Sequence, residues 1–175
     1  RLEYRGYDSA GIAVLDDVGN VAVRKRSGKL VRLIELLEAN PVPASGTGIG
    51  HTRWATHGGP TDVNAHPHLG DAGKLALIHN GIVENFAELK AELDVAGIPL
   101  QSETDTEVVA ALLGLEVSRV GDLETAFQNV VKRLHGTHLK TGKNKADMAE
   151  QLRDDIRTFM KDRGCARAVA VWCGS

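Results

Sequence analysis

The segment from Gly48 to His68 (GIGHTRWATHGGPTDVNAHPH) most constrains how this chain can fold. It holds four of the seven histidines, together with an arginine and a tryptophan, and it fits neither an amphipathic helix nor an alternating strand. Gly58, Gly59 and Pro60 interrupt the segment, so we predict a short strand that leads into a shaped loop. Loops on a rigid scaffold often carry binding groups, so a functional site is expected here.

The polar side chains of this loop suggest what it binds. Arg53 offers a planar guanidinium fork that matches a carboxylate, and Thr56 and His57 add hydrogen-bonding groups. A site for a small molecule that carries a carboxylate is therefore predicted. Arg53 could instead be a surface arginine paired with a nearby acid. Trp54 could act in closing the loop or could simply pack beneath it.

Composition excludes several classes of function. With 175 residues the chain can form one domain with a sizeable core, and its net charge of −2 lacks the basic excess of a nucleic-acid surface. No apolar run is long enough to span a bilayer, and no segment resembles a signal peptide. The two cysteines, Cys165 and Cys173, make no disulfide framework, which favours a cytoplasmic setting. Neither lies in a motif that activates a thiol.

Hydrophobic periodicity predicts an alternation of strands and helices. Strands are expected at residues 9–15, 21–25, 48–54 and 74–79, and helices at 29–39, 85–96, 105–117 and 123–134. Ser102, Thr104 and Asp105 are candidate caps at the start of the third helix. Beyond a basic, polar stretch at 137–145, a charged helix is expected at 146–163 and an apolar strand at 168–173.

Four ordered blocks carry a resemblance to a known family: LEYRGYDSAGIAV, HTRWATHG, HNGIVEN and SETDTEVVAALL. Residues 1–136 resemble the glutaminase domain of the glutamine–fructose-6-phosphate aminotransferase family, which belongs to the class II amidotransferases. The resemblance implies an α+β fold of the N-terminal-nucleophile hydrolase type, an αββα sandwich with antiparallel sheets, expected here to be incomplete. It also implies amidotransfer from glutamine to fructose 6-phosphate, giving glucosamine 6-phosphate in a homodimeric intact enzyme that needs no cofactor for its glutaminase half.

The resemblance gives roles to the polar residues. Arg53 would hold the α-carboxylate of glutamine, with Thr56 and His57 as further contacts, and Asp105 would accept a hydrogen bond from the α-ammonium group. The alternative for Asp105 is a helix cap. An oxyanion intermediate needs converging donors, which the Asn80 side-chain amide and the Gly81 backbone N–H would supply; Gly81 would also contact the substrate. On its own, the Asn80-Gly81 dipeptide favours a plain turn. 

The same resemblance implies a nucleophile that this sequence lacks. In the family it is a cysteine at the mature N-terminus, whose own α-amino group serves as the base. Residue 1 here is arginine, so we expect a fragment that cannot hydrolyse glutamine alone. Arg5, within EYRGYDS, is similar to a family arginine that orients the nucleophile, although a structural salt bridge is the alternative.

Rival interpretations come from the histidines and from the tail. The histidines could hold a metal, yet no ligand spacing typical of a zinc site is present; His66, His68 and His79 would otherwise connect loops by hydrogen bonds. Residues 137–175 are similar to part of an NAD-binding domain of an inositol-phosphate synthase, but the chain has no G-x-G-x-x-G turn. The tail could be a graft, an artefact or a divergent ending. A glutamine-binding remnant without turnover is a further alternative.

Overall fold

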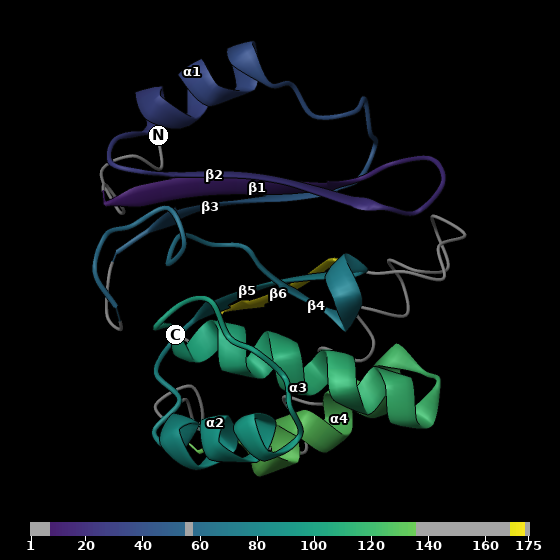
Figure 1. Ribbon diagram of the computed structural model, residues 1–175. Coiled ribbons are helices and arrows are strands. Elements are labelled where there is room, and N and C mark those ends of the chain that lie inside the picture. Colours follow the sequence, from purple (N-terminus) through teal and green to yellow (C-terminus); the bar gives the residue numbers. More distant parts are fainter. Residues whose placement is uncertain (1–7, 55–57, 136–168, 174–175) are drawn as a thin grey trace.

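The structure is a computed structural model, and it describes residues 8–54 and 58–135 together with the backbone of residues 169–173 (Figure 1). Its strands are β1 (Ser9–Leu15), β2 (Val21–Ser27), β3 (Gly48–Arg53), β4 (His68–Gly70), β5 (Leu75–Asn80) and β6 (Val169–Cys173). Its helices are α1 (Leu30–Ala39), α2 (Phe86–Val95), α3 (Asp105–Val120) and α4 (Leu123–Arg133), with a 3-10 turn at Asp71–Gly73.

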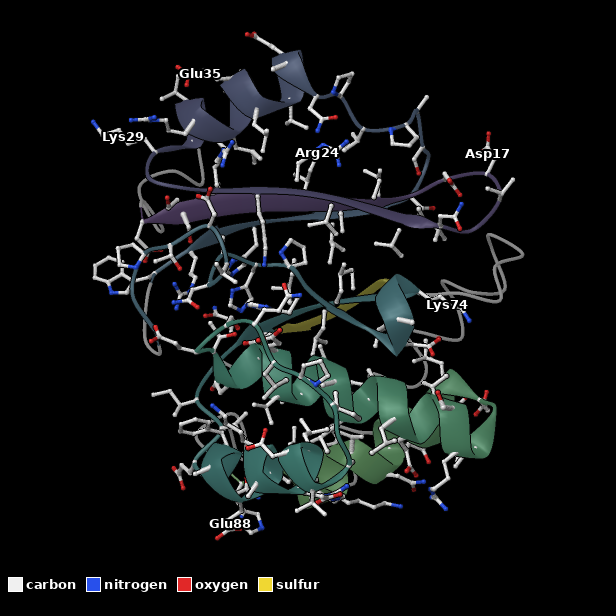
Figure 2. All side chains as sticks on the ribbon, viewed as in Figure 1. Asp17, Arg24, Lys29, Glu35, Lys74 and Glu88 are labelled. Carbon is white, nitrogen blue, oxygen red and sulfur yellow. The ribbon has the colours of Figure 1, made fainter. Side chains whose placement is uncertain are left out.

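These elements stack as an αββα sandwich (Figure 1). Helix α1 covers the outer face of the sheet β2-β1-β3, a second sheet β4-β5-β6 lies beneath it, and α3 packs on that sheet with α2 and α4 outside. The expected fold class is therefore confirmed. In Figure 2, Lys29 and Glu35 project from α1 at one end of the molecule and Glu88 from α2 at the other, so these charges face solvent on both outer layers.

The strand pairing departs from expectation in the second sheet. Strand β1 pairs antiparallel with both neighbours, and β4 pairs antiparallel with β5. Strand β6 instead runs parallel to β5, with Asn80 opposite Cys173, so the prediction of purely antiparallel sheets is wrong for this pair. Parallel strands need a long connection rather than a hairpin, and more than eighty residues separate β5 from β6.

The main core lies between the second sheet and its helices. Its buried side chains come from β5, α2, α3 and α4, and they include Leu77, Leu93, Leu112, Leu113 and Phe127. Between the two sheets the packing is closer and uses smaller residues. A Cβ on Gly11 would lie only 2.1 Å from the carbonyl oxygen of His66, so this position in β1 tolerates no side chain.

Strand β2 anchors the loop that leads into the second sheet. The ammonium group of Lys25 donates to the carbonyl oxygens of Val63, Ala65 and Pro67 at 2.9, 2.8 and 3.4 Å. Asp62, in the same loop, accepts hydrogen bonds from the Ser27 backbone and hydroxyl and pairs with Arg26. These contacts hold the residues before His66 against the first sheet.

Most predicted elements are present, with small shifts at their ends. Strand β2 continues to Ser27, two residues further than expected, because Arg26 and Ser27 still pair with β1. Helix α3 extends to Val120 and ends at Gly121 in the left-handed conformation. Strand β4 was not predicted, and the helix expected at 146–163 lies outside the described residues. Within the described ranges, every helix is too short or too polar to cross a bilayer.

Candidate functional site

A small cavity lies where β3 and β5 end and α3 begins. Its volume is about 20 Å³, roughly the space of one water molecule. Ten residues line it: His51, Arg53, Trp54, His66, His79, Asn80, Gly81, Thr104, Asp105 and Thr106. Five of the candidate site residues predicted from the sequence, Arg53, Trp54, Asn80, Gly81 and Asp105, thus meet in one place, although they come from segments far apart in the chain.

Arg53 is the last residue of β3 and is only 3% exposed. Its guanidinium donates to the carbonyl oxygens of Gly58 and Gly59 at 3.2 and 3.4 Å, and it lies 3.9 Å from the carboxylate of Asp8. Burial lowers the pKa of Arg53, while the nearby carboxylates of Asp8 and Asp105 oppose that shift. Arg53 is therefore a buried cation on the cavity wall and not a surface arginine.

Asp105 contributes a buried carboxylate to the wall of the same cavity. It is the first residue of α3 and is 3% exposed. One oxygen, Oδ2, accepts a hydrogen bond of 2.8 Å from the backbone N–H of Val83. The cap of α3 is Thr104, whose hydroxyl accepts from the Glu107 backbone N–H, so the alternative interpretation of Asp105 as the cap is wrong.

Ser102, the other cap candidate, contributes to the same helix start in a different way. Its backbone N–H and its hydroxyl both donate to the carboxylate of Glu107, at 2.5 and 2.6 Å. Together with the Thr104 cap, this reciprocal arrangement is a capping box displaced by two residues. The start of α3 is thereby fixed on both sides of the cavity residue Asp105.

Asn80 and Gly81 lie at the end of β5, beside the two charged groups. Asn80 is the last residue of the strand, and the chain continues through a short bend into α2 rather than returning as a hairpin. In the described chain, neither residue is among those with positive φ, which a two-residue hairpin turn of type I′ requires at both positions. The plain hairpin turn is therefore not what these residues form.

The loop residues fall partly outside the described ranges. Trp54 is described, is 62% exposed and reaches the rim of the cavity, so it is not buried beneath the loop. Thr56, His57 and Arg5 lie outside the described residues. A cavity of about 20 Å³ is far smaller than an amino acid, so any such ligand requires the loop or the rim side chains to move.

Two buried histidines, His66 and His68, bond to residues that line the cavity. The Nε2 atoms of His66 and His68 lie 2.9 Å from the hydroxyls of Thr106 and Thr104, so they connect loops by hydrogen bonds as the simpler interpretation expected. Burial is the main cause that lowers the pKa of both rings, to about 3 for His68 and further for His66. Both imidazoles are consequently neutral at physiological pH. No group of three potential ligands suited to a metal ion occurs among the described residues.

The sequence analysis did not single out Thr106, and it considered His51 only as one of the histidines that could hold a metal. Both line the cavity, and Thr106 follows Asp105 directly. The SETDTE motif contains a signal that could have identified Thr106, because a buried threonine next to a functional acid on a helix start can reach its carboxylate. The contact to His66 had no such signal, since the two residues are 40 positions apart.

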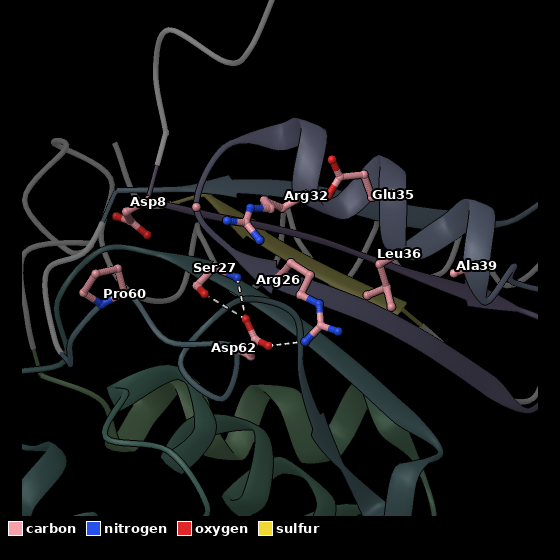
Figure 3. Close-up of a pocket in the computed structure, with 10 residues that line it drawn as sticks. Asp8, Arg26, Ser27, Arg32, Glu35, Leu36, Ala39, Pro60 and Asp62 are labelled. Carbon is pink, nitrogen blue, oxygen red and sulfur yellow. Dashed lines mark hydrogen bonds and ion pairs between the residues drawn. The ribbon is translucent and has the colours of Figure 1, made fainter.

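A larger cavity, of about 770 Å³, lies elsewhere, between α1 and the loop around Asp62 (Figure 3). Its wall carries Arg26 and Arg32 but also Asp8, Glu35 and Asp62. Figure 3 shows Arg26 and Ser27 both directed at Asp62, so part of this charge is already neutralised within the protein. None of the candidate site residues predicted from the sequence lines this larger cavity, and we assign it no ligand.

Comparison with known proteins identifies relatives of this chain. The family model for the glutamine amidotransferase domain matches residues 39–139. Proteins called glutamine–fructose-6-phosphate aminotransferase (isomerizing) are 64% identical in Leifsonia xyli and Streptomyces coelicolor, each over 136 residues, and 53% identical in Aquifex aeolicus. These alignments cover 78% of this chain but only 22% of each relative.

A solved structure gives the same result for the fold. Glutamine phosphoribosylpyrophosphate amidotransferase from B. subtilis, complexed with ADP and GMP, superposes with a TM-score of 0.62 at 31% identity. The match covers 77% of this chain and 29% of that structure. The αββα sandwich agrees with the matched family model, and this chain belongs to the glutamine amidotransferase family.

Proposed function

We propose that this chain is the glutamine-handling part of a glutamine–fructose-6-phosphate aminotransferase, which makes glucosamine 6-phosphate with ammonia taken from glutamine. The observation that supports the proposal is that a buried arginine, Arg53, and a buried aspartate, Asp105, line the same cavity as Asn80 and Gly81. The named relatives support the choice of acceptor sugar, although the chain spans only 22% of their length.

The two charged residues complement the two charged groups of an amino acid. The guanidinium of Arg53 can hold an α-carboxylate through two parallel hydrogen bonds, which fixes orientation as well as charge. Asp105 can accept a hydrogen bond from the α-ammonium group. Contacts to Gly58 and Gly59 fix the plane of the Arg53 guanidinium before any ligand arrives, which reduces the entropy lost on binding.

The reacting end of the ligand would lie toward β5. Attack on the side-chain amide of glutamine creates an oxyanion, and preorganised donors stabilise it. We assign these donors to the Asn80 side-chain amide and the Gly81 N–H. Thr56 and His57 would add substrate contacts from the loop, and Trp54, exposed at the rim, would act in closing it.

The nucleophile in this proposal is an N-terminal cysteine, with Arg5 beside it in an orienting role. The two cysteines of the printed sequence, Cys165 and Cys173, are not assigned that part. No metal or organic cofactor is required for glutamine hydrolysis by this route. A glutaminase region ending near residue 136, a distinct tail at 137–175, a cytoplasmic location and a homodimeric intact enzyme complete the proposal. The family match, which ends at residue 139, supports that boundary.

The test is glutamine binding by the full chain, measured by titration calorimetry. Arg53→Lys keeps the charge but removes the fork, and we expect the Kd to rise by about tenfold or more. The matched control is Arg26→Lys, which alters an exposed arginine outside the cavity and should change the Kd by less than about twofold. L-Glutaminamide, which lacks the carboxylate, should bind the parent and the Arg53→Lys chain equally weakly.

Ammonia release from the same samples separates binding from turnover. Saturable glutamine binding without release of ammonia is the expected result. The same result also fits the alternative of a remnant that binds glutamine but does not hydrolyse it. Release by the chain as given would contradict the assigned nucleophile, and Cys173→Ser would then test the cysteine whose backbone pairs with Asn80. Absence of saturable glutamine binding in the folded chain would overturn the proposal.

A further inference from the structure

Two parallel hydrogen bonds brace the segment that carries Asp105. His66 and His68, two residues apart, bond to Thr106 and Thr104, which are also two residues apart, each at 2.9 Å. Asp105 is the residue between the two threonines. The brace joins the loop that β2 anchors to the start of α3, so it controls where the Asp105 carboxylate lies relative to the first sheet.

Both oxygens of the Asp105 carboxylate have a hydrogen-bond donor. Oδ2 accepts from the backbone N–H of Val83 at 2.8 Å. Oδ1 lies 3.5 Å from the Thr106 hydroxyl, which is positioned to donate to it. A carboxylate held at both oxygens has a fixed plane.

The direction of the hydrogen bonds follows from His66. Its ring is 5% exposed, and within the described ranges its Nδ1 atom has no hydrogen-bond partner. A buried N–H without a partner is rarer and costlier than an unpaired acceptor, so we assign the proton to Nε2. Nε2–H then donates to Thr106, and the hydroxyl hydrogen of Thr106 is left to point at Asp105.

We propose that Thr106, oriented by His66, is a positioning residue that sets the Asp105 carboxylate for the α-ammonium group of the amino-acid ligand. This inference rests on the proposed glutamine site. Thr106 acts through Asp105 and not on the reacting amide, so it governs recognition of the ammonium group and leaves the other contacts of the ligand alone.

Thr104 serves as a comparison for Thr106 because its hydroxyl makes different hydrogen bonds. It accepts from the Glu107 backbone N–H at 3.3 Å, as the cap of α3, and lies 2.9 Å from the Ser102 hydroxyl. Removing it weakens the helix start as a whole. Removing the Thr106 hydroxyl leaves the cap in place but removes the contact to one oxygen of Asp105 together with the bond to His66. The two threonines therefore separate a structural effect from a positioning effect.

The experiment measures binding of two ligands to the full chain by calorimetry: L-glutamine, and 4-carbamoylbutanoate, which is glutamine without its α-ammonium group. Thr106→Val should raise the Kd for glutamine by about tenfold, the size expected for a lost hydrogen bond to a charged group, and should leave the Kd for 4-carbamoylbutanoate within about twofold. Thr106→Ser should restore glutamine affinity. His66→Gln keeps a donor and should bind as the parent does, whereas His66→Leu should resemble Thr106→Val.

The outcomes separate the two proposals. If the parent chain binds no glutamine, the proposed function fails and the positioning role fails with it. If the parent binds and Thr106→Val weakens both ligands by the same factor, as Thr104→Val should, the role of Thr106 is structural and this inference is wrong. Melting temperatures of all variants identify any loss of folding, and in that event Thr106→Ser and His66→Gln decide the question.

Discussion

The buried histidines make the stability of this fold sensitive to mild acid. His66 and His68 are 5% and 3% exposed, and burial holds the pKa of both rings well below 6.5, the value for an unfolded chain. Between about pH 3 and 6.5 the unfolded chain therefore binds protons that the folded chain does not. Stability is fully present above pH 6.5 and is lost as the pH falls below it.

The size of the effect follows from the same linkage. For each buried histidine that stays neutral in the folded chain, the free energy of unfolding is about 1.4 kcal/mol lower at pH 5.5 than at pH 7.5. The pair therefore accounts for about 3 kcal/mol. Burial lowers the pKa of His51 as well, which adds in the same direction. A loss of this size is a large part of the stability of a typical domain.

Urea unfolding at pH 7.5 and 5.5 measures this difference. His66→Gln with His68→Gln places an amide that does not titrate near each threonine hydroxyl, so the double variant should lose about 3 kcal/mol less on acidification than the parent does. His135→Gln changes an exposed histidine and should follow the parent. If the double variant and the parent have the same dependence on pH, the burial of neutral imidazoles is not the cause.

Three further changes test the packing of the fold by urea unfolding at neutral pH. Gly11→Ala should destabilise the chain by about 2 kcal/mol or more, because its methyl group would meet the His66 carbonyl; Gly59→Ala, with open space around it, should stay within about 0.5 kcal/mol. Lys25→Met should cost about 2 kcal/mol, since it leaves three carbonyl oxygens without their donor, and an unchanged midpoint would show that these bonds contribute nothing. Asp122→Ala removes the side chain that caps α4 and should cost about 1 kcal/mol; equal stability would argue against the cap.

The sequence allowed most of the fold to be predicted because its periodic segments are long. Strand β1 was predicted with its observed ends, and the four helices of the described part with shifts of a few residues. Strand β4 has only three residues, His68–Gly70, and no alternation to reveal it. The direction of β6 depends on what it pairs with, and no local pattern encodes that.

The candidate site was predictable only where a motif carried it. Arg53, Asn80, Gly81 and Asp105 were recognisable from three motifs, and the fold brings them to one cavity. Thr106 was not singled out, because its importance comes from a histidine distant in sequence. Contacts of that kind arise from the register between layers, which a single sequence does not display.

Lys25 can also be regarded as a tethered monovalent cation. Three carbonyl oxygens surround its ammonium group much as they would surround a bound potassium ion, but the charge is covalently attached and cannot diffuse away. The bonds that Lys25 makes to the loop therefore need no cation from the medium. They depend on pH instead, because burial lowers the pKa of Lys25 to about 8. In alkaline solution the neutral amine of Lys25 has only two N–H groups for these three oxygens, and the bonds that remain lose the assistance of the charge.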